Sequence, residues 1–88
     1  MKHFRVVHRL SRRIRVIAPP LVKEAERCYI LEILLRKHPA VKDVAIVADI
    51  GSLAIRFDPL ALPEERLLAT LDDGFHRQIG QHRLAHQI

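Results

Sequence analysis

The sequence predicts an α+β domain in which two helices cover one face of an antiparallel sheet. Its 88 residues suffice for a single domain. Apolar and polar residues alternate in some segments, which is typical of strands, and apolar residues recur every three or four positions in others, which is typical of helices. These patterns follow one another as strand, helix, strand, strand and helix, an order that is typical of a layered α+β fold.

The first strand is expected over residues 4–18. Apolar residues alternate with arginines over residues 13–18, after an interruption at Ser11. We therefore expect one long strand with a bulge or turn near Ser11. Pro19 and Pro20 end this strand, because a proline cannot donate a backbone hydrogen bond to a neighbouring strand.

The first helix is expected over residues 21–37. Its apolar residues recur at helical spacing, and they are Leu21, Ala25, Cys28, Leu31 and Leu35. Four more apolar residues widen this stripe beyond what one sheet face requires, and they are Tyr29, Ile30, Ile33 and Leu34. This excess of apolar surface favours a contact with a partner or with a second copy of the chain. Pro39 ends the helix.

A hairpin and a second helix are expected next. The hairpin strands are expected over residues 41–48 and 53–58, and Gly51 between them supplies the positive φ that a tight turn often requires. The second helix is expected to begin at Pro63, a favourable first helical residue, and to end at Gly74.

Residues 75–88 follow the body of the domain, which we place at residues 1–74. Residues 75–79 are expected to form a short fourth strand, and the remainder a polar tail that contains histidines. With this strand the order of elements becomes βαββαβ. That order predicts the ferredoxin-like arrangement, an antiparallel sheet with two helices on one face.

The positive charge is concentrated at the N-terminal end of the chain. The formal net charge is +5, and residues 1–15 carry +6 without an acidic residue. The first and third strands are central neighbours in a ferredoxin-like sheet, so three outward arginines are expected to share its open face, namely Arg13, Arg15 and Arg56. Such a surface can bind phosphates or an acidic protein, or can serve only to keep the strands from aggregating. Residues 1–9 are expected to be either a strand extension or a loose basic arm.

Recognition of nucleic acid is the less favoured use of this surface. RNA-binding domains with this topology stack bases on aromatic residues of the first and third strands. Here those positions hold arginines, and Phe57 belongs to the inward-facing set. A purely electrostatic attraction to phosphates would weaken as salt is added.

The sequence also argues against several classes of protein. No apolar run approaches the roughly 20 residues that span a bilayer, and no signal peptide opens the chain, so we expect a cytoplasmic protein without a membrane span. A single cysteine forms no internal disulfide. No Ser, Thr or Cys stands in a recognisable context with a histidine and a carboxylate, so we expect no enzyme.

A resemblance to a known family rests on four segments. In chain order they are Arg12-Arg13-Ile14-Arg15-Val16 before the two prolines, His38-Pro39-Ala40-Val41, Asp49-Ile50-Gly51-Ser52-Leu53 and Phe57-Asp58-Pro59. Together they make residues 10–74 resemble the heavy-metal-associated domain, in the divergent branch found at the N-termini of metal-transporting P-type ATPases and as small stand-alone proteins. The resemblance implies a ferredoxin-like fold and a place in a metal-transport system.

Metal binding in that family depends on two cysteines in the loop between the first strand and the first helix. In this chain the corresponding residues 18–25 contain no Cys, His or Met, so we expect no dithiolate site and no cofactor. Cys28 is expected in the core, where free cysteines are common. Three histidines near the C-terminus are weak candidates for a transition-metal site, with a plain solvated tail as the alternative, and they are His76, His82 and His86.

Together with this resemblance, the sequence predicts a non-enzymatic accessory, regulatory or interaction domain of a metal-transport system. Its partner would be a protein such as a metal transporter, or a second copy of the chain. The predicted binding surface consists of Arg13, Arg15, Arg56, Tyr29, Ile30, Ile33 and Leu34. The alternative is a basic module that binds nucleic acid or an anionic surface through its N-terminal arginines.

Overall fold

The computed structural model of the chain describes the backbone of residues 3–87 and the side chains of residues 3–77. Two hairpins build a four-stranded sheet, and their strands are β1 (Arg5–Leu10), β2 (Arg13–Ile17), β3 (Val41–Val47) and β4 (Ser52–Phe57). The strands lie in the order β1-β2-β4-β3, and every neighbouring pair is antiparallel. The predicted α+β class and antiparallel sheet are therefore confirmed.

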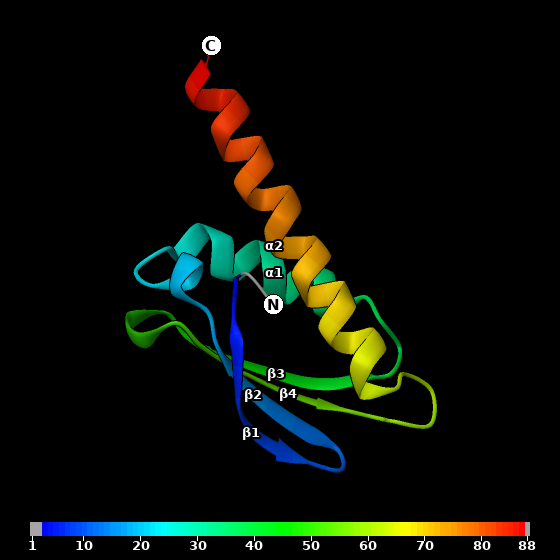
Figure 1. Cartoon of the computed structure of the whole chain (residues 1–88). Helices are drawn as coiled ribbons and strands as arrows, with labels where there is room; N and C mark the ends of the chain where they lie inside the picture. Colours follow the sequence, from blue (N-terminus) through cyan, green and yellow to red (C-terminus); the bar gives the residue numbers. More distant parts are fainter. Residues whose placement is uncertain (1–2, 88) are drawn as a thin grey trace.

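Two helices cover one face of this sheet (Figure 1). Helix α1 (Ala25–Arg36) connects the two hairpins, and α2 (Glu64–Gln87) follows β4 and extends beyond the sheet. Two 3₁₀ turns precede α1 and β4, at Pro19–Leu21 and Ala48–Ile50. Both helices lie on the same side of the sheet, so its opposite face is not covered by any helix of the described chain.

The core lies between the sheet and the helices. The inward residues of the central strands alternate with outward ones, as the sequence pattern predicts, and the largest of them are Ile14, Val16, Leu53, Ile55 and Phe57. From the helices they meet the buried side chains Leu31, Leu35, Leu67, Leu71 and Phe75. Burial of this apolar surface is the main force that holds the helices on the sheet.

The expected turn near Ser11 is confirmed, but it divides the expected long first strand into two, because the segment folds back on itself at Ser11 and Arg12. β1 and β2 pair with Leu10 opposite Arg13, which leaves a two-residue turn between them. The pairing shifts between Val6 and His8, so β1 contains a bulge. The N-terminal residues thus supply an edge strand beside β2.

The expected fourth strand at residues 75–79 is also wrong, because α2 continues through Gly74 to Gln87. Phe75 is fully buried, and an ion pair of 3.1 Å joins Asp73 to Arg77 one turn later in the same helix. The chain order is therefore ββαββα instead of the predicted βαββαβ. The sheet order is compatible with a ferredoxin-like arrangement whose outer strand comes from the N-terminal end of the chain.

Helix α1 begins four residues later than expected, at Ala25. Pro19 and Pro20 start a 3₁₀ turn in which Leu21 is buried, and Lys23 adopts a positive φ of 56° before the helix begins. Ala25 is exposed and does not belong to the buried stripe, which consists of Leu21, Cys28, Leu31 and Leu35.

Candidate functional site

Helix α1 carries apolar side chains on two opposite sides. Cys28, Leu31 and Leu35 face the core. On the opposite side lie four exposed side chains, which we call the α1 patch: Tyr29, Ile30, Ile33 and Leu34. A helix that packs against a sheet normally presents polar residues to water on its outer side. The α1 patch therefore has the composition of a contact surface.

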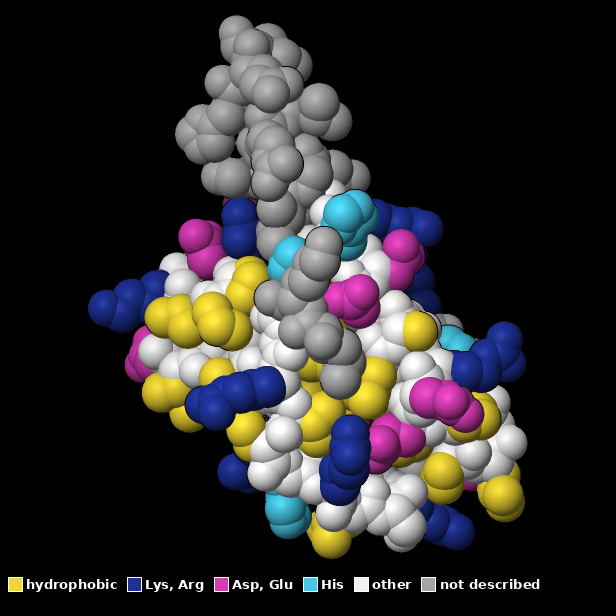
Figure 2. All heavy atoms as spheres, viewed as in Figure 1, with side chains coloured by type: hydrophobic (Ala, Val, Ile, Leu, Met, Phe, Trp, Pro, Cys, Tyr) yellow, Lys and Arg dark blue, Asp and Glu magenta, His cyan; other side chains and the backbone are white. Residues whose placement is uncertain are grey.

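The exposure of the α1 patch is substantial for such large side chains. Tyr29 is 63% exposed and Leu34 is 48% exposed. In Figure 2, hydrophobic side chains reach the surface at several places, among them the end of the molecule where the loop before α1 lies, with basic side chains between them. Contiguous exposed apolar residues of this kind commonly mark a site of protein–protein contact.

A groove separates the α1 patch from α2. Ile30 and Leu34 line it from α1, and Asp73, Gly74 and Arg77 line it from α2, around a volume of about 440 Å³. We call Asp73, Gly74 and Arg77 the α2 wall of the groove. The sequence did not predict this wall, because a glycine commonly ends a helix. The signal that the helix continues past Gly74 is the spacing of the apolar residues Leu67, Leu71 and Phe75, which lie four apart.

The arginines occupy the open face of the sheet, on the side away from the helices. The strand register places Arg13 directly opposite Arg56, and Arg15 opposite both Ala54 of β4 and His8 of β1. Side chains at directly opposed positions of an antiparallel pair lie about 5 Å apart at Cβ, so like charges there repel each other. The predicted grouping of the three arginines on one face is thus found in the register.

These arginines receive little compensation from acidic groups. Within residues 3–77, Arg13, Arg15 and Arg56 make no ion pair and no hydrogen bond through their side chains. Asp43 also lies opposite Arg56, but its carboxylate is 3.5 Å from the guanidinium of Arg36 at the end of α1. The open face therefore keeps a positive charge.

The chain has four aromatic residues of the Phe and Tyr type and no Trp, and none of them lies on the open face. Phe4, Phe57 and Phe75 are buried in the core, and Tyr29 belongs to the α1 patch. Single-stranded nucleic acid is usually held by bases stacked on such rings. The open face is accordingly suited to charge attraction and not to base stacking.

The loop that would hold a metal in heavy-metal-associated domains does not fit one here. The loop forms the 3₁₀ turn Pro19–Leu21 and offers no thiol, imidazole or thioether. Cys28 lies in the next helix with its Sγ buried and donating to the carbonyl oxygen of Leu21 at 3.6 Å. Burial raises the pKa of the Cys28 thiol, which disfavours the thiolate that a soft metal requires.

The histidine candidates are only partly described. His76 is exposed on α2, and its ring centroid is 6.3 Å from that of His3. The side chains of His82 and His86 lie outside the described residues. Among the side chains that the structure does describe, no three of the His, Cys, Asp and Glu type lie close enough together to hold a metal ion.

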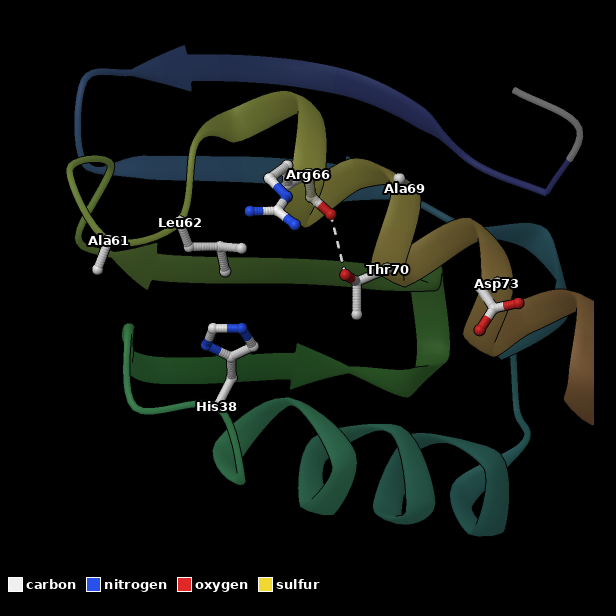
Figure 3. A pocket seen from close by; sticks show the side chains of 7 residues that line it. All are labelled: His38, Ala61, Leu62, Arg66, Ala69, Thr70 and Asp73. Carbon is white, nitrogen blue, oxygen red and sulfur yellow. Dashed lines mark hydrogen bonds between the residues drawn. The ribbon is translucent and has the colours of Figure 1, made fainter.

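A second hollow lies between the end of α1 and the first turns of α2 (Figure 3). His38 faces it from one side, and Arg66, Thr70 and Asp73 face it from α2. The Thr70 hydroxyl donates to the carbonyl oxygen of Arg66 at 2.9 Å, and the Nδ1 of His38 accepts from the amide of Ala40 at 3.4 Å. Thr70 and His38 thus do not form a nucleophile–base pair, the arrangement that covalent catalysis requires.

Two further observations bear on the class of the protein. In the part of the chain that the structure describes, no helix is both long enough and apolar enough to cross a membrane. Comparison of the chain with models of protein families, with curated proteins and with solved structures found no match.

Proposed function

We propose that this chain is a non-enzymatic interaction domain that docks on a protein partner through the α1 patch and the adjoining groove. The observation that supports it most is the position of Tyr29, Ile30, Ile33 and Leu34 on the side of α1 opposite to its buried side. Leaving apolar area in water forgoes about 25 cal/mol for each Å² that could be buried. A partner that covers the patch would recover this free energy.

The four segments that resemble the heavy-metal-associated domain suggest the setting in which the domain acts, namely a metal-transport system, with a protein of that system or a second copy of the chain as the partner. Because the loop at Pro19–Leu21 carries no metal ligand and Cys28 is buried, the domain would serve there by docking and not by passing a metal ion. Regulation or assembly of a transporter is the role that this proposal assigns to it.

The test replaces two residues of the α1 patch. Ile30→Asp with Ile33→Asp is expected to abolish partner capture while leaving the fold intact, because both side chains are 41% exposed and neither belongs to the buried core. The tagged chain and its variants are compared by affinity capture and quantitative mass spectrometry, with circular dichroism as a check on folding.

Leu60→Asp with Ile50→Asp is the matched control, because it also introduces two acidic side chains. Leu60 and Ile50 are 90% and 59% exposed and lie outside the α1 patch. Capture should persist in the control. A chain that binds neither another protein nor a second copy of itself, or whose captured proteins persist in the patch variant, would contradict the proposal.

A second candidate function is attraction to an anionic polymer or surface through the open face. Its support is the register that places Arg13 opposite Arg56, with Arg15 beside them and no ion pair to any of the three among the described side chains. Keeping like charges opposed costs stability, roughly 0.2–1 kcal/mol for a cross-strand pair. An anion that lies between them would offset this cost.

Substitution of these arginines is expected to remove a salt-dependent interaction. In buffer of about 50 mM salt, the wild-type chain should bind duplex DNA or acidic vesicles, and the triple variant Arg13→Gln, Arg15→Gln, Arg56→Gln should not. In single variants, the slope of log affinity against log salt should fall by about one for each arginine that no longer neutralises a phosphate. Fluorescence anisotropy measures binding to duplex DNA, and co-sedimentation measures binding to the acidic vesicles.

The control for this prediction changes charge by the same amount elsewhere. Lys23→Gln, Lys37→Gln and Arg66→Gln remove three positive charges from exposed positions on the helical side of the molecule. Equal loss of binding in both triple variants would show that only net charge matters, and no binding by the wild-type chain would rule this function out.

A further inference from the structure

The exposed side of α1 carries opposite charges at its two ends. Glu26 precedes the apolar residues and Lys37, the C-cap residue of α1, follows them. The positions 26, 30, 33 and 37 are spaced four, three and four apart, which places them along one side of a helix. Both charged side chains are exposed, and neither forms an ion pair with a described residue.

These residues are arranged symmetrically about the middle of the helix, between Leu31 and Glu32. Ile30 and Ile33 are equally far from this midpoint, as are Tyr29 and Leu34, and as are Glu26 and Lys37. Residues at equal distances are chemically complementary in each case: an aliphatic residue with an aliphatic residue, an aromatic with an aliphatic, and an acid with a base. A surface with this property can bind a copy of itself.

We infer that the partner of the α1 patch is a second copy of this chain, bound with the two α1 helices antiparallel about a two-fold axis through that midpoint. This inference rests on the proposed function. In such a pair, Ile30 meets Ile33 of the second copy and Glu26 meets Lys37 of the second copy, and each of these contacts occurs twice. Parallel helices would instead place Glu26 beside Glu26 and Lys37 beside Lys37.

Arg27 and Arg36 are also equally far from the midpoint and carry like charges, but both side chains are held within their own chain. Arg27 donates to the carbonyl oxygen of Pro20 at 3.3 Å, and Arg36 is paired with Glu32, at 3.0 Å within the same helix, and with Asp43. Antiparallel helices also align their dipoles favourably, because the positive end of one lies beside the negative end of the other. The hydroxyl of Tyr29 is at the tip of a largely exposed side chain and can remain in water at the rim of the contact.

The size of the surface implies a weak and reversible dimer. A helix of 12 residues is about 18 Å long. Stable interfaces bury about 800 Å² on each partner, more than four partly exposed side chains supply, so the groove walls at Asp73 and Arg77 would have to contribute. We expect a dissociation constant in the micromolar range and a monomer at high dilution.

The test is a charge exchange followed by sedimentation equilibrium of the full chain at low ionic strength. Glu26→Lys alone, or Lys37→Glu alone, replaces two attractive contacts by two repulsive ones and should weaken the dimer by about tenfold. An equimolar mixture of the two variants should restore dimers of near wild-type affinity, because both contacts between unlike variants again join opposite charges. Added salt should reduce the difference.

Two further variants complete the design. Ile33→Asp should abolish the dimer although Glu26 and Lys37 are unchanged. Leu60→Asp should leave the dimer unchanged. Circular dichroism establishes that each variant is folded. A wild-type chain that is monomeric at every concentration, or single charge variants that dimerise normally, or a mixture that does not restore the dimer, would overturn the inference. If another protein is still captured through the α1 patch, only the inference fails and the proposed function stands.

Discussion

Replacing Gly51 with alanine is expected to lower the free energy of unfolding by roughly 2–4 kcal/mol. Gly51 has a φ of +66°, in the left-handed region that is unfavourable for a residue with a side chain. A Cβ atom there would lie 2.5 Å from the carbonyl oxygen of Ala18. This oxygen cannot move away cheaply, because the amide of Ala18 donates to the carbonyl of Gly51 at 2.8 Å and holds the two segments together.

Urea and thermal unfolding measure this effect. A domain of this size has only about 5 kcal/mol of stability, so the Gly51→Ala variant should unfold at a clearly lower temperature, by about 4–8 °C for each kcal/mol of stability removed. The same substitution at Gly74 is the control. A Cβ atom there would meet the Cδ1 of Leu31 at an ordinary 3.6 Å, and alanine favours a helix by up to about 1 kcal/mol over glycine.

The two alanine variants should therefore change stability in opposite directions. Gly74→Ala should raise it by roughly 0.5–1 kcal/mol. A Gly51→Ala variant as stable as the wild type would contradict the left-handed turn. The turn also positions the start of α1, since the amide of Lys23 donates to the carbonyl of Ala48 at 2.9 Å. Its disruption is consequently expected to disturb the helix that carries the α1 patch.

Much of the sheet and the first helix could be predicted because their patterns are local. Ile14 and Val16 are buried while Arg13 and Arg15 are exposed, as strict alternation requires. The positive φ of Gly51 is confirmed as well. The surplus of apolar residues in α1 predicted side chains that the sheet does not cover, because a helix of this length has only one side turned toward the core.

The two ends of the chain could not be predicted in this way. Gly74 is a plausible helix end in the sequence, but a glycine inside a helix costs only about 1 kcal/mol, and burial of Phe75 outweighs that cost. Whether the residues before Ser11 extend β2 or fold back depends on which strand occupies the neighbouring edge, which is a property of the whole sheet. Since residues 75–79 are helical, β1 fills that edge.

In the candidate site, too, the features set by local sequence patterns could be predicted, and those that depend on the rest of the fold could not. The α1 patch and the three arginines could be placed from spacing alone. The α2 wall of the groove could not, because it exists only if the helix continues past Gly74 and brings Arg77 beside α1. Glu26 and Lys37 can be read from the sequence, but their complementarity predicts a contact only after the structure has shown that both lie on the exposed side of α1.

Phe75→Ala is expected to lower the free energy of unfolding by about 3–5 kcal/mol. Phe75 is fully buried on α2, and its ring centroid is 5.7 Å from that of Phe4. Phe4 immediately precedes β1, so this contact attaches the N-terminal edge strand to α2. Of a stability of about 5 kcal/mol, a loss of this size would leave at most about 2 kcal/mol, so a measurable fraction of the chain would be unfolded at 25 °C. His76→Ala, one residue further on the exposed side of α2, is the control and should change stability by about 0.5 kcal/mol or less.

A milder variant keeps this prediction measurable. Phe75→Leu should cost about 1–2 kcal/mol and remain folded, and a double-mutant cycle with Phe4→Leu should report a coupling of about 0.5–1.5 kcal/mol between the two rings. Hydrogen exchange adds the structural readout, because removal of either ring should speed exchange in β1 before it affects β4 at the centre of the sheet. If Phe75→Leu and Phe4→Leu acted independently, and β1 stayed protected in both, the contact between the two rings would not be what attaches β1 to α2, and the pairing of β1 with β2 would suffice to hold the edge strand.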